Sequence, residues 1–181
     1  RQVYRINYDN LNIEKRPCLT EEQNKVVEEV NLREYKTYLL YGVTGSGKTE
    51  VYMNLIERVI KSGKRALFLV PEISLTAQMI ERFYKRFSSS VAIFHSGLSN
   101  GEKYDEYQKI YRGEVSIVVG TRSAIFTPLK DIGIIILDEE HSNTYKQDTT
   151  PKYNAIDVAK WRGRYNNCPV ILGSATPLIT D

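Results

Sequence analysis

The sequence predicts an α/β protein with a doubly wound, mostly parallel sheet, and three observations support this fold class. Helical patterns lie between most of a series of apolar runs, and strands that alternate with helices favour a parallel sheet. The runs are rich in Val, Ile and Leu without alternation, which is typical of strands buried on both faces. Each run is followed by glycine, polar or charged residues. The six runs cover residues 38–41, 66–70, 91–94, 115–119, 132–137 and 170–172.

Helix boundaries are marked by caps in the sequence. A capping box at Thr20 and Gln23 predicts a first helix that reaches about residue 33. The next helix, over 49–61, stops at Gly63, which is typical of a helix C-terminus. Further helices are expected over 74–87, from the capping box at Ser99 and Glu102 to just before Gly113, and over 154–164. We expect residues 1–18 to be a linker that leads into a single lobe over 19–181.

Composition limits the possible classes of protein. With 41% hydrophobic and 26% charged residues, the 181-residue chain is globular, not disordered. No apolar run approaches the ~20 residues that span a bilayer, so we expect a cytoplasmic protein without membrane contact. The sequence begins at Arg1 without a signal peptide, and we expect it to be a fragment. Cys18 and Cys168 are too far apart for C-x-x-C spacing, which gives no support to a zinc site.

Residues 42–49 form a complete G-x-x-x-x-G-K-[ST] phosphate-binding loop between a predicted strand and a predicted helix. In such a loop the backbone N–H groups turn toward one centre, where the helix N-terminus adds partial positive charge. Lys48 is expected to reach the β- and γ-phosphates, and the Thr49 hydroxyl to bind Mg²⁺. The other expected nucleotide-binding positions are Gly42, Thr44, Gly45, Ser46 and Gly47. The sequence therefore predicts a nucleoside triphosphate site.

A second cluster, Asp138-Glu139-Glu140-His141, follows the most hydrophobic predicted strand. Asp138 is placed to hold Mg²⁺ together with Thr49, and Glu139 to orient and deprotonate an attacking water. An acidic helix start is the alternative interpretation of these carboxylates. With a phosphate loop about 90 residues upstream, the catalytic interpretation is favoured.

Other segments carry weaker signals. Ser174 and Thr176 offer hydroxyls after the last strand, although an ordinary tight turn explains them equally well. Gln23 could read an adenine edge or simply cap a helix. Three segments could contact nucleic acid through hydroxyls, one arginine and interleaved tyrosines and lysines, and a solvated surface loop is the equal alternative for the last of them. They are 71–78, 120–122 and 143–153.

Taken together, these motifs resemble the first motor lobe of superfamily 2 helicases, and among those the bacterial replication-restart helicases. The resemblance covers residues 19–179 and rests on the phosphate loop and on seven further runs of sequence. They are 70–76, 95–99, 120–126, 138–141, 145–147, 151–153 and 173–177. It implies a RecA-like fold that binds ATP and Mg²⁺ and moves along DNA in the 3′ to 5′ direction.

The resemblance also implies roles for individual residues. Gln23 would read adenine, Asp138 would hold the metal and Glu139 would activate water. The loop from His141 to Tyr153 would couple DNA binding to hydrolysis, and Ser174 and Thr176 would link hydrolysis to strand separation. The implied DNA contacts are Pro71, Ser74, Thr76, Thr121, Arg122, Tyr145, Lys146 and Tyr153.

Partners implied by the resemblance are single-stranded and forked DNA, single-strand DNA-binding protein and other primosome proteins. A second lobe with arginine fingers, and a group of zinc-binding cysteines, are expected outside this sequence. We therefore expect the lobe alone to bind nucleotide without efficient hydrolysis. Alternatives are another superfamily 2 motor (an RNA helicase, DNA-uptake or restriction translocase), a small-molecule kinase and a non-catalytic nucleotide-binding module. A kinase would need a basic lid, which no Arg-rich stretch after residue 113 supplies.

Overall fold

The computed structural model describes residues 19–40, 46–139, 145–148 and 152–174. Its centre is a six-stranded sheet in the order β1-β8-β5-β2-β4-β3, in which every neighbouring pair is parallel. The predicted doubly wound parallel fold is confirmed. The strands are β1 (Thr37–Leu40), β2 (Arg65–Leu69), β3 (Val91–Phe94), β4 (Ile117–Gly120), β5 (Ile132–Leu137) and β8 (Val170–Gly173).

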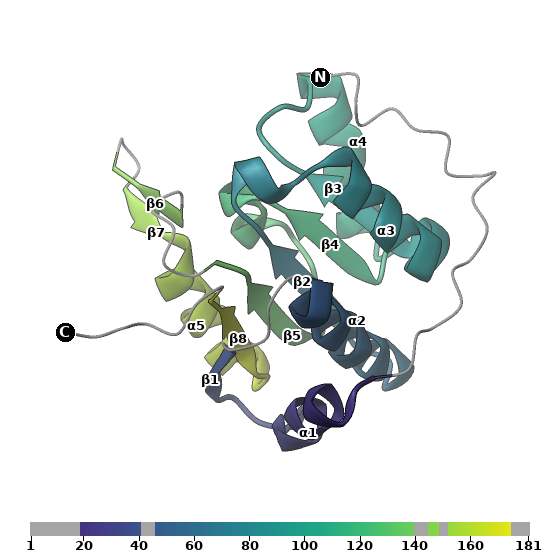
Figure 1. Cartoon of the computed structure of the whole chain (residues 1–181). Coiled ribbons are helices and arrows are strands. Elements are labelled where there is room, and N and C mark those ends of the chain that lie inside the picture. The colour runs from purple at the N-terminus through teal and green to yellow at the C-terminus, as the bar shows by residue number, and fades with distance from the viewer. Residues whose placement is uncertain (1–18, 41–45, 140–144, 149–151, 175–181) are drawn as a thin grey trace.

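Helices cover both faces of the sheet, so that the molecule has three layers (Figure 1). The helices α1, α2 and α3 share one apolar cluster with alternate strand residues, and α4 and α5 share a second cluster with the intervening ones. The helices are α1 (Glu21–Glu29), α2 (Ser46–Lys61), α3 (Ala77–Phe87), α4 (Asn100–Tyr111) and α5 (Ala155–Asn166), with short 3₁₀ turns η3 (Glu72–Ser74), η4 (Ser88–Ser90) and η5 (Arg122–Phe126). Among the helices of the described residues, none combines the length and the apolar character needed to cross a bilayer.

Burial follows strand position in the sheet. The central strands β2, β4, β5 and β8 are buried along almost their whole length, as their continuous apolar runs predict. The prediction is wrong for β1, which among the described strands pairs with β8 alone and leaves Leu39 46% exposed. The other edge strand, β3, is buried along most of its length, so edge position alone does not explain the exposure of β1.

Several helix boundaries differ from those predicted. The helix α2 begins at Ser46 instead of Thr49, and α5 ends at Asn166 instead of Arg164. The helix α1 ends at Glu29 instead of near residue 33, because the Asn31 side chain accepts from the backbone N–H of Arg33 in a local turn. The helix α3 begins at Ala77 instead of Ser74, since the Thr76 hydroxyl caps it by accepting from the N–H of Met79. Both predicted capping boxes, at the starts of α1 and α4, are confirmed.

A short antiparallel hairpin lies in a segment that we expected to be a loop. It pairs β6 (Lys146–Gln147) with β7 (Tyr153–Asn154). Two-residue strands carry too little periodicity to be recognised in a sequence. The expected linker over residues 1–18 lies outside the described residues.

Because the six strands are parallel, their carboxyl ends share one edge of the sheet. This edge carries the segments that sequence analysis singled out: η3 after β2, His95 after β3, η5 after β4, Asp138 after β5 and Ser174 after β8. His95 is buried, and its Nδ1 accepts from the N–H of Gly97. It is a hydrogen-bonded loop residue.

A buried ionic cluster ties α3 to the beginning of α2. The Arg86 guanidinium lies 2.8 Å from Glu50 Oε1 and 3.0 Å from Glu57 Oε2, and its side chain is 2% exposed. Burial alone would lower the pKa of Arg86, but the hydrogen bonds and charges of both carboxylates together raise it. Glu50 directly follows Thr49, so the cluster fixes the helix that carries the phosphate loop.

Replacing Arg86 with alanine should lower the free energy of unfolding by about 3–5 kcal/mol, because it removes the buried cation that contacts both Glu50 and Glu57. Arg82→Ala is the matched control, since Arg82 contacts the same Glu50 from a more exposed position, and it should cost less than about 1 kcal/mol. Urea denaturation of both variants measures the difference. Equal losses would contradict the role given to burial.

Candidate nucleotide and nucleic-acid site

The structure brings Lys48 and Asp138 together at the carboxyl edge of the sheet. Lys48 lies in the first turn of α2, and Asp138 is the first residue after β5. The Lys48 ammonium donates to Asp138 Oδ1 over 3.0 Å, and the two side chains are 7% and 13% exposed. Two predicted site residues that are 90 positions apart in the sequence therefore share one buried ion pair.

Tyr52 also contacts this carboxylate, and sequence reasoning did not identify it as a site residue. Its hydroxyl donates to Asp138 Oδ1 over 2.7 Å. Burial, with Asp138 alongside, raises the pKa of Tyr52, so its hydroxyl stays protonated and remains a donor. The only signal in the sequence is its position four residues after Lys48, which puts both side chains on one face of a helix.

Gly173 closes the site from the last strand. A Cβ at this position would lie 1.8 Å from the Tyr52 hydroxyl and 2.5 Å from Asp138 Oδ1. No side chain fits there unless Tyr52 or Asp138 moves. Ser174 follows, and is buried with its N–H donating to the carbonyl of Leu40. Thr176 and His141 lie outside the described residues.

The expectation that Tyr145 stacks on DNA is corrected by its burial. Its side chain is 1% exposed, and its hydroxyl donates to the carbonyl oxygens of Leu69 and Asp138. A ring packed into the core offers no face to a base. Tyr145 instead connects the ends of β2 and β5, and burial raises the pKa of its phenol.

Glu139 has a left-handed backbone, with φ of 54°. This conformation is uncommon for a residue with a side chain and persists only where the surroundings hold it. The Ser74 hydroxyl donates to Glu139 Oε2 over 2.8 Å. The expected water-activating carboxylate is therefore bound to η3, the turn that follows β2.

Gln23 lies beside the phosphate loop. Its Oε1 accepts from the N–H of Thr20, which confirms the capping interpretation. Its Nε2 donates to the carbonyl of Gly47 over 3.0 Å. Adenine recognition by Gln23 stays a prediction. Gly42, Thr44 and Gly45 lie outside the described residues, whereas Ser46 opens α2 and Thr49 lies buried in its first turn.

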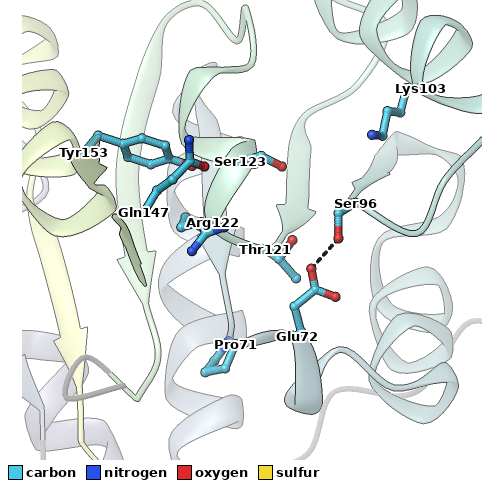
Figure 2. Close-up of a pocket in the computed structure, with 9 residues that line it drawn as sticks. All are labelled: Pro71, Glu72, Ser96, Lys103, Thr121, Arg122, Ser123, Gln147 and Tyr153. Atoms are coloured by element: carbon cyan, nitrogen blue, oxygen red, sulfur yellow. Dashed lines mark hydrogen bonds between the residues drawn. The ribbon is translucent and has the colours of Figure 1, made fainter. Parts of the chain in front are cut away.

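A pocket of about 320 Å³ opens along the same edge of the sheet, beside η3 (Figure 2). Four of its lining residues are among the expected DNA contacts: Pro71, Thr121, Arg122 and Tyr153. Five others were not singled out as site residues from the sequence: Glu72, Ser96, Lys103, Ser123 and Gln147. Lys103 lies in α4, and no motif in the sequence marks it.

Arg122 anchors the hairpin at the wall of this pocket. Its guanidinium donates to the carbonyl of Lys146 over 2.7 Å and lies 6.0 Å from the centre of the Tyr153 ring. The expected contacts Ser74, Thr76 and Lys146 do not line the pocket. The Thr76 hydroxyl is used as the cap of α3. The pocket thus joins only part of the predicted nucleic-acid surface.

The parallel sheet, the lysine in the first turn of α2 and the acid after β5 together define a RecA-like lobe of the superfamily 2 helicase class. The family described as "Type III restriction enzyme, res subunit" matches residues 13–179, and the chain belongs to this family.

Among similar sequences are two named "Replication restart protein PriA". That of Bacillus subtilis (strain 168) is 53% identical over 98% of this chain, and that of Synechocystis sp. is 51% identical over 93%. The chain spans only 23% and 20% of their respective lengths. The predicted resemblance to replication-restart proteins is confirmed.

Solved structures support the same fold. RecG bound to a three-way DNA junction aligns with a TM-score of 0.68 and 25% identity, over 89% of this chain and 21% of RecG. The Pyrococcus furiosus Hef helicase domain aligns with a TM-score of 0.64 and 22% identity, over 91% of this chain and 34% of Hef.

Tyr52→Phe should lower the free energy of unfolding by about 1.5–3 kcal/mol, the usual range for a hydrogen bond to a charged group. Tyr84→Phe is the control, because the Tyr84 hydroxyl donates to the neutral carbonyl of Val91 over 3.2 Å, and it should cost about 0.5–1.5 kcal/mol. Urea denaturation compares the two variants. A smaller loss for Tyr52→Phe would argue against its bond to Asp138.

Proposed function

We propose that this chain is the first motor lobe of an ATP-dependent DNA helicase that acts in the restart of stalled replication forks. The observation that carries the proposal is the 3.0 Å contact of Lys48 with Asp138. In nucleotide-hydrolysing proteins with this loop, such a lysine holds phosphates while the acid after a buried strand holds Mg²⁺. Similarity to the PriA proteins supports the role in replication restart.

The residues at this edge fit a magnesium nucleotide. Thr49 offers a hydroxyl one residue beyond Lys48, and Asp138 offers a carboxylate with one oxygen already bound by Lys48 and Tyr52. Within the described residues, no group of three or more His, Cys, Asp or Glu side chains could hold a metal. Mg²⁺ needs no such group, because it usually takes one or two protein ligands together with phosphate and water oxygens. When bound, it neutralises charge on the phosphates.

Different residues of the chain bind the phosphates, activate the water and recognise the base. Lys48 and the backbone N–H groups of Gly42, Thr44, Gly45, Ser46 and Gly47 bind the phosphates. Glu139 orients the attacking water and accepts its proton. Gln23 holds the carbonyl of Gly47 and reads the adenine edge.

A single DNA strand would lie along the carboxyl edge of the sheet. The pocket with Pro71, Thr121, Arg122 and Tyr153 supports this path, because it combines a cation, a hydroxyl and an aromatic ring. The segment from His141 to Tyr153, with Ser174 and Thr176, would couple strand binding to hydrolysis. By similarity we propose 3′ to 5′ movement, forked DNA as substrate, and single-strand DNA-binding protein and primosome proteins as partners.

Another superfamily 2 motor is the second candidate, because the matching family is named for a restriction enzyme subunit. Comparing ATPase stimulation by forked DNA, unbranched duplex DNA and RNA separates the candidates. Replication restart predicts the strongest stimulation by forked DNA. Equal or greater stimulation by unbranched duplex DNA or by RNA would favour the alternative.

Lys48→Ala in the complete protein should lower ATP turnover by at least roughly 10²–10³-fold, the usual loss when one preorganised hydrogen-bond donor is removed. Binding of forked DNA should persist, because Lys48 does not line the DNA pocket. Phosphate release and fluorescence anisotropy measure the two properties. Lys61→Ala, at the exposed far end of α2, is the matched control. Retained turnover in Lys48→Ala would contradict the assignment.

The 181-residue chain alone should bind ATP weakly and hydrolyse it negligibly, with or without DNA. An arginine finger, which a second lobe would supply, raises the hydrolysis rate by roughly 10³–10⁵-fold where this has been measured. Calorimetry and a phosphate-release assay on the chain and on the complete protein test this expectation. Substantial DNA-stimulated hydrolysis by the chain alone would refute it.

A further inference from the structure

The turn η3 separates the DNA pocket from the hydrolytic site and contacts both of them. Two of its three residues point to different partners. The Ser74 hydroxyl donates to Glu139 Oε2 over 2.8 Å, on the side of the hydrolytic site. The Glu72 carboxylate accepts from the Ser96 hydroxyl over 2.6 Å within the pocket (Figure 2).

From this arrangement we infer that Ser74 is a positioning residue that holds Glu139 away from water until a DNA strand enters the pocket. The inference rests on the proposed function, in which Glu139 is the water-activating base. A general base must lie within hydrogen-bonding reach of the water that it deprotonates. With Oε2 bound to Ser74, the Glu139 side chain is directed at η3 and is not free to follow the attacking water.

The backbone conformation of Glu139 indicates that contacts hold this residue in place. Its φ of 54° is uncommon for a residue with a side chain. Tyr145 fixes the preceding carbonyl, that of Asp138, and Ser74 fixes the carboxylate. The bonds from Lys48, Tyr52 and Tyr145 all go to Asp138 and not to the side chain of Glu139. Once the Ser74 bond is lost, the Glu139 side chain can therefore change direction while Asp138 stays in place.

The charged side chains of the pocket can explain how Glu139 is released from Ser74. Glu72 is an acid in a pocket whose Lys103 and Arg122 would attract a phosphate. A phosphate bound there repels the Glu72 carboxylate at short range. Because η3 is a single turn of three residues, displacement of Glu72 also moves Ser74. Strand binding therefore withdraws the Ser74 hydroxyl and frees Glu139.

The test compares ATP hydrolysis by the complete protein with and without a saturating single-stranded oligonucleotide. Ser74→Ala should raise the DNA-independent rate about tenfold, equivalent to about 1.4 kcal/mol, and leave the DNA-saturated rate within about twofold. Ser74→Thr keeps the hydroxyl and should behave as the wild type. Ser90→Ala, which removes a serine hydroxyl bonded to the carbonyl of Phe87, is the control and should change neither rate.

A purely structural role for Ser74 predicts a lower melting temperature and an unchanged or lower DNA-independent rate, and that result would overturn the inference. A second variant, Glu72→Gln, removes the charge on the pocket side. It should reduce stimulation by DNA several-fold, although fluorescence anisotropy should show equal or tighter strand binding. Unchanged stimulation would also overturn the inference. If the wild-type protein showed no stimulation at all, the proposed function itself would fail.

Discussion

The carboxylate of Asp138 is the point on which the functional edge of this molecule depends. One of its oxygens accepts from both Lys48 and Tyr52, which lie one helical turn apart in α2. The backbone of β8 approaches the same oxygen at Gly173. A charge buried in this way is tolerated only when it is paired and hydrogen-bonded. β5, α2 and β8 therefore meet at a single carboxylate.

Other buried polar side chains also connect the elements around this edge of the sheet. Tyr145 is packed into the core and joins the ends of β2 and β5, and Arg86 holds α3 against the beginning of α2. The core thus holds its polar segments through a few buried hydrogen bonds and ion pairs, which keeps the reacting groups in place before any ligand binds.

The sequence was sufficient for the fold class because the central strands are continuous apolar runs and the caps at Thr20 and Ser99 are local. Lys48 and Asp138 were found because motif residues end up together when parallel strands share an edge. Tyr52 and Lys103 could not be found, since their roles depend on contacts between distant segments. Tyr145 was misjudged because a tyrosine beside lysine reads as an exposed stacking residue, whereas tertiary packing places it inside.

Gly173 carries a consequence for how such a site can vary. Gly173 presents only main-chain atoms to the Asp138 carboxylate, and even one added methyl group would occupy the space that this carboxylate now fills. A larger residue there would push the carboxylate toward solvent and loosen its grip on the neighbouring ammonium. The size of the residue at the end of β8, and not only the identity of the charged side chains, therefore determines how strongly Asp138 and Lys48 interact.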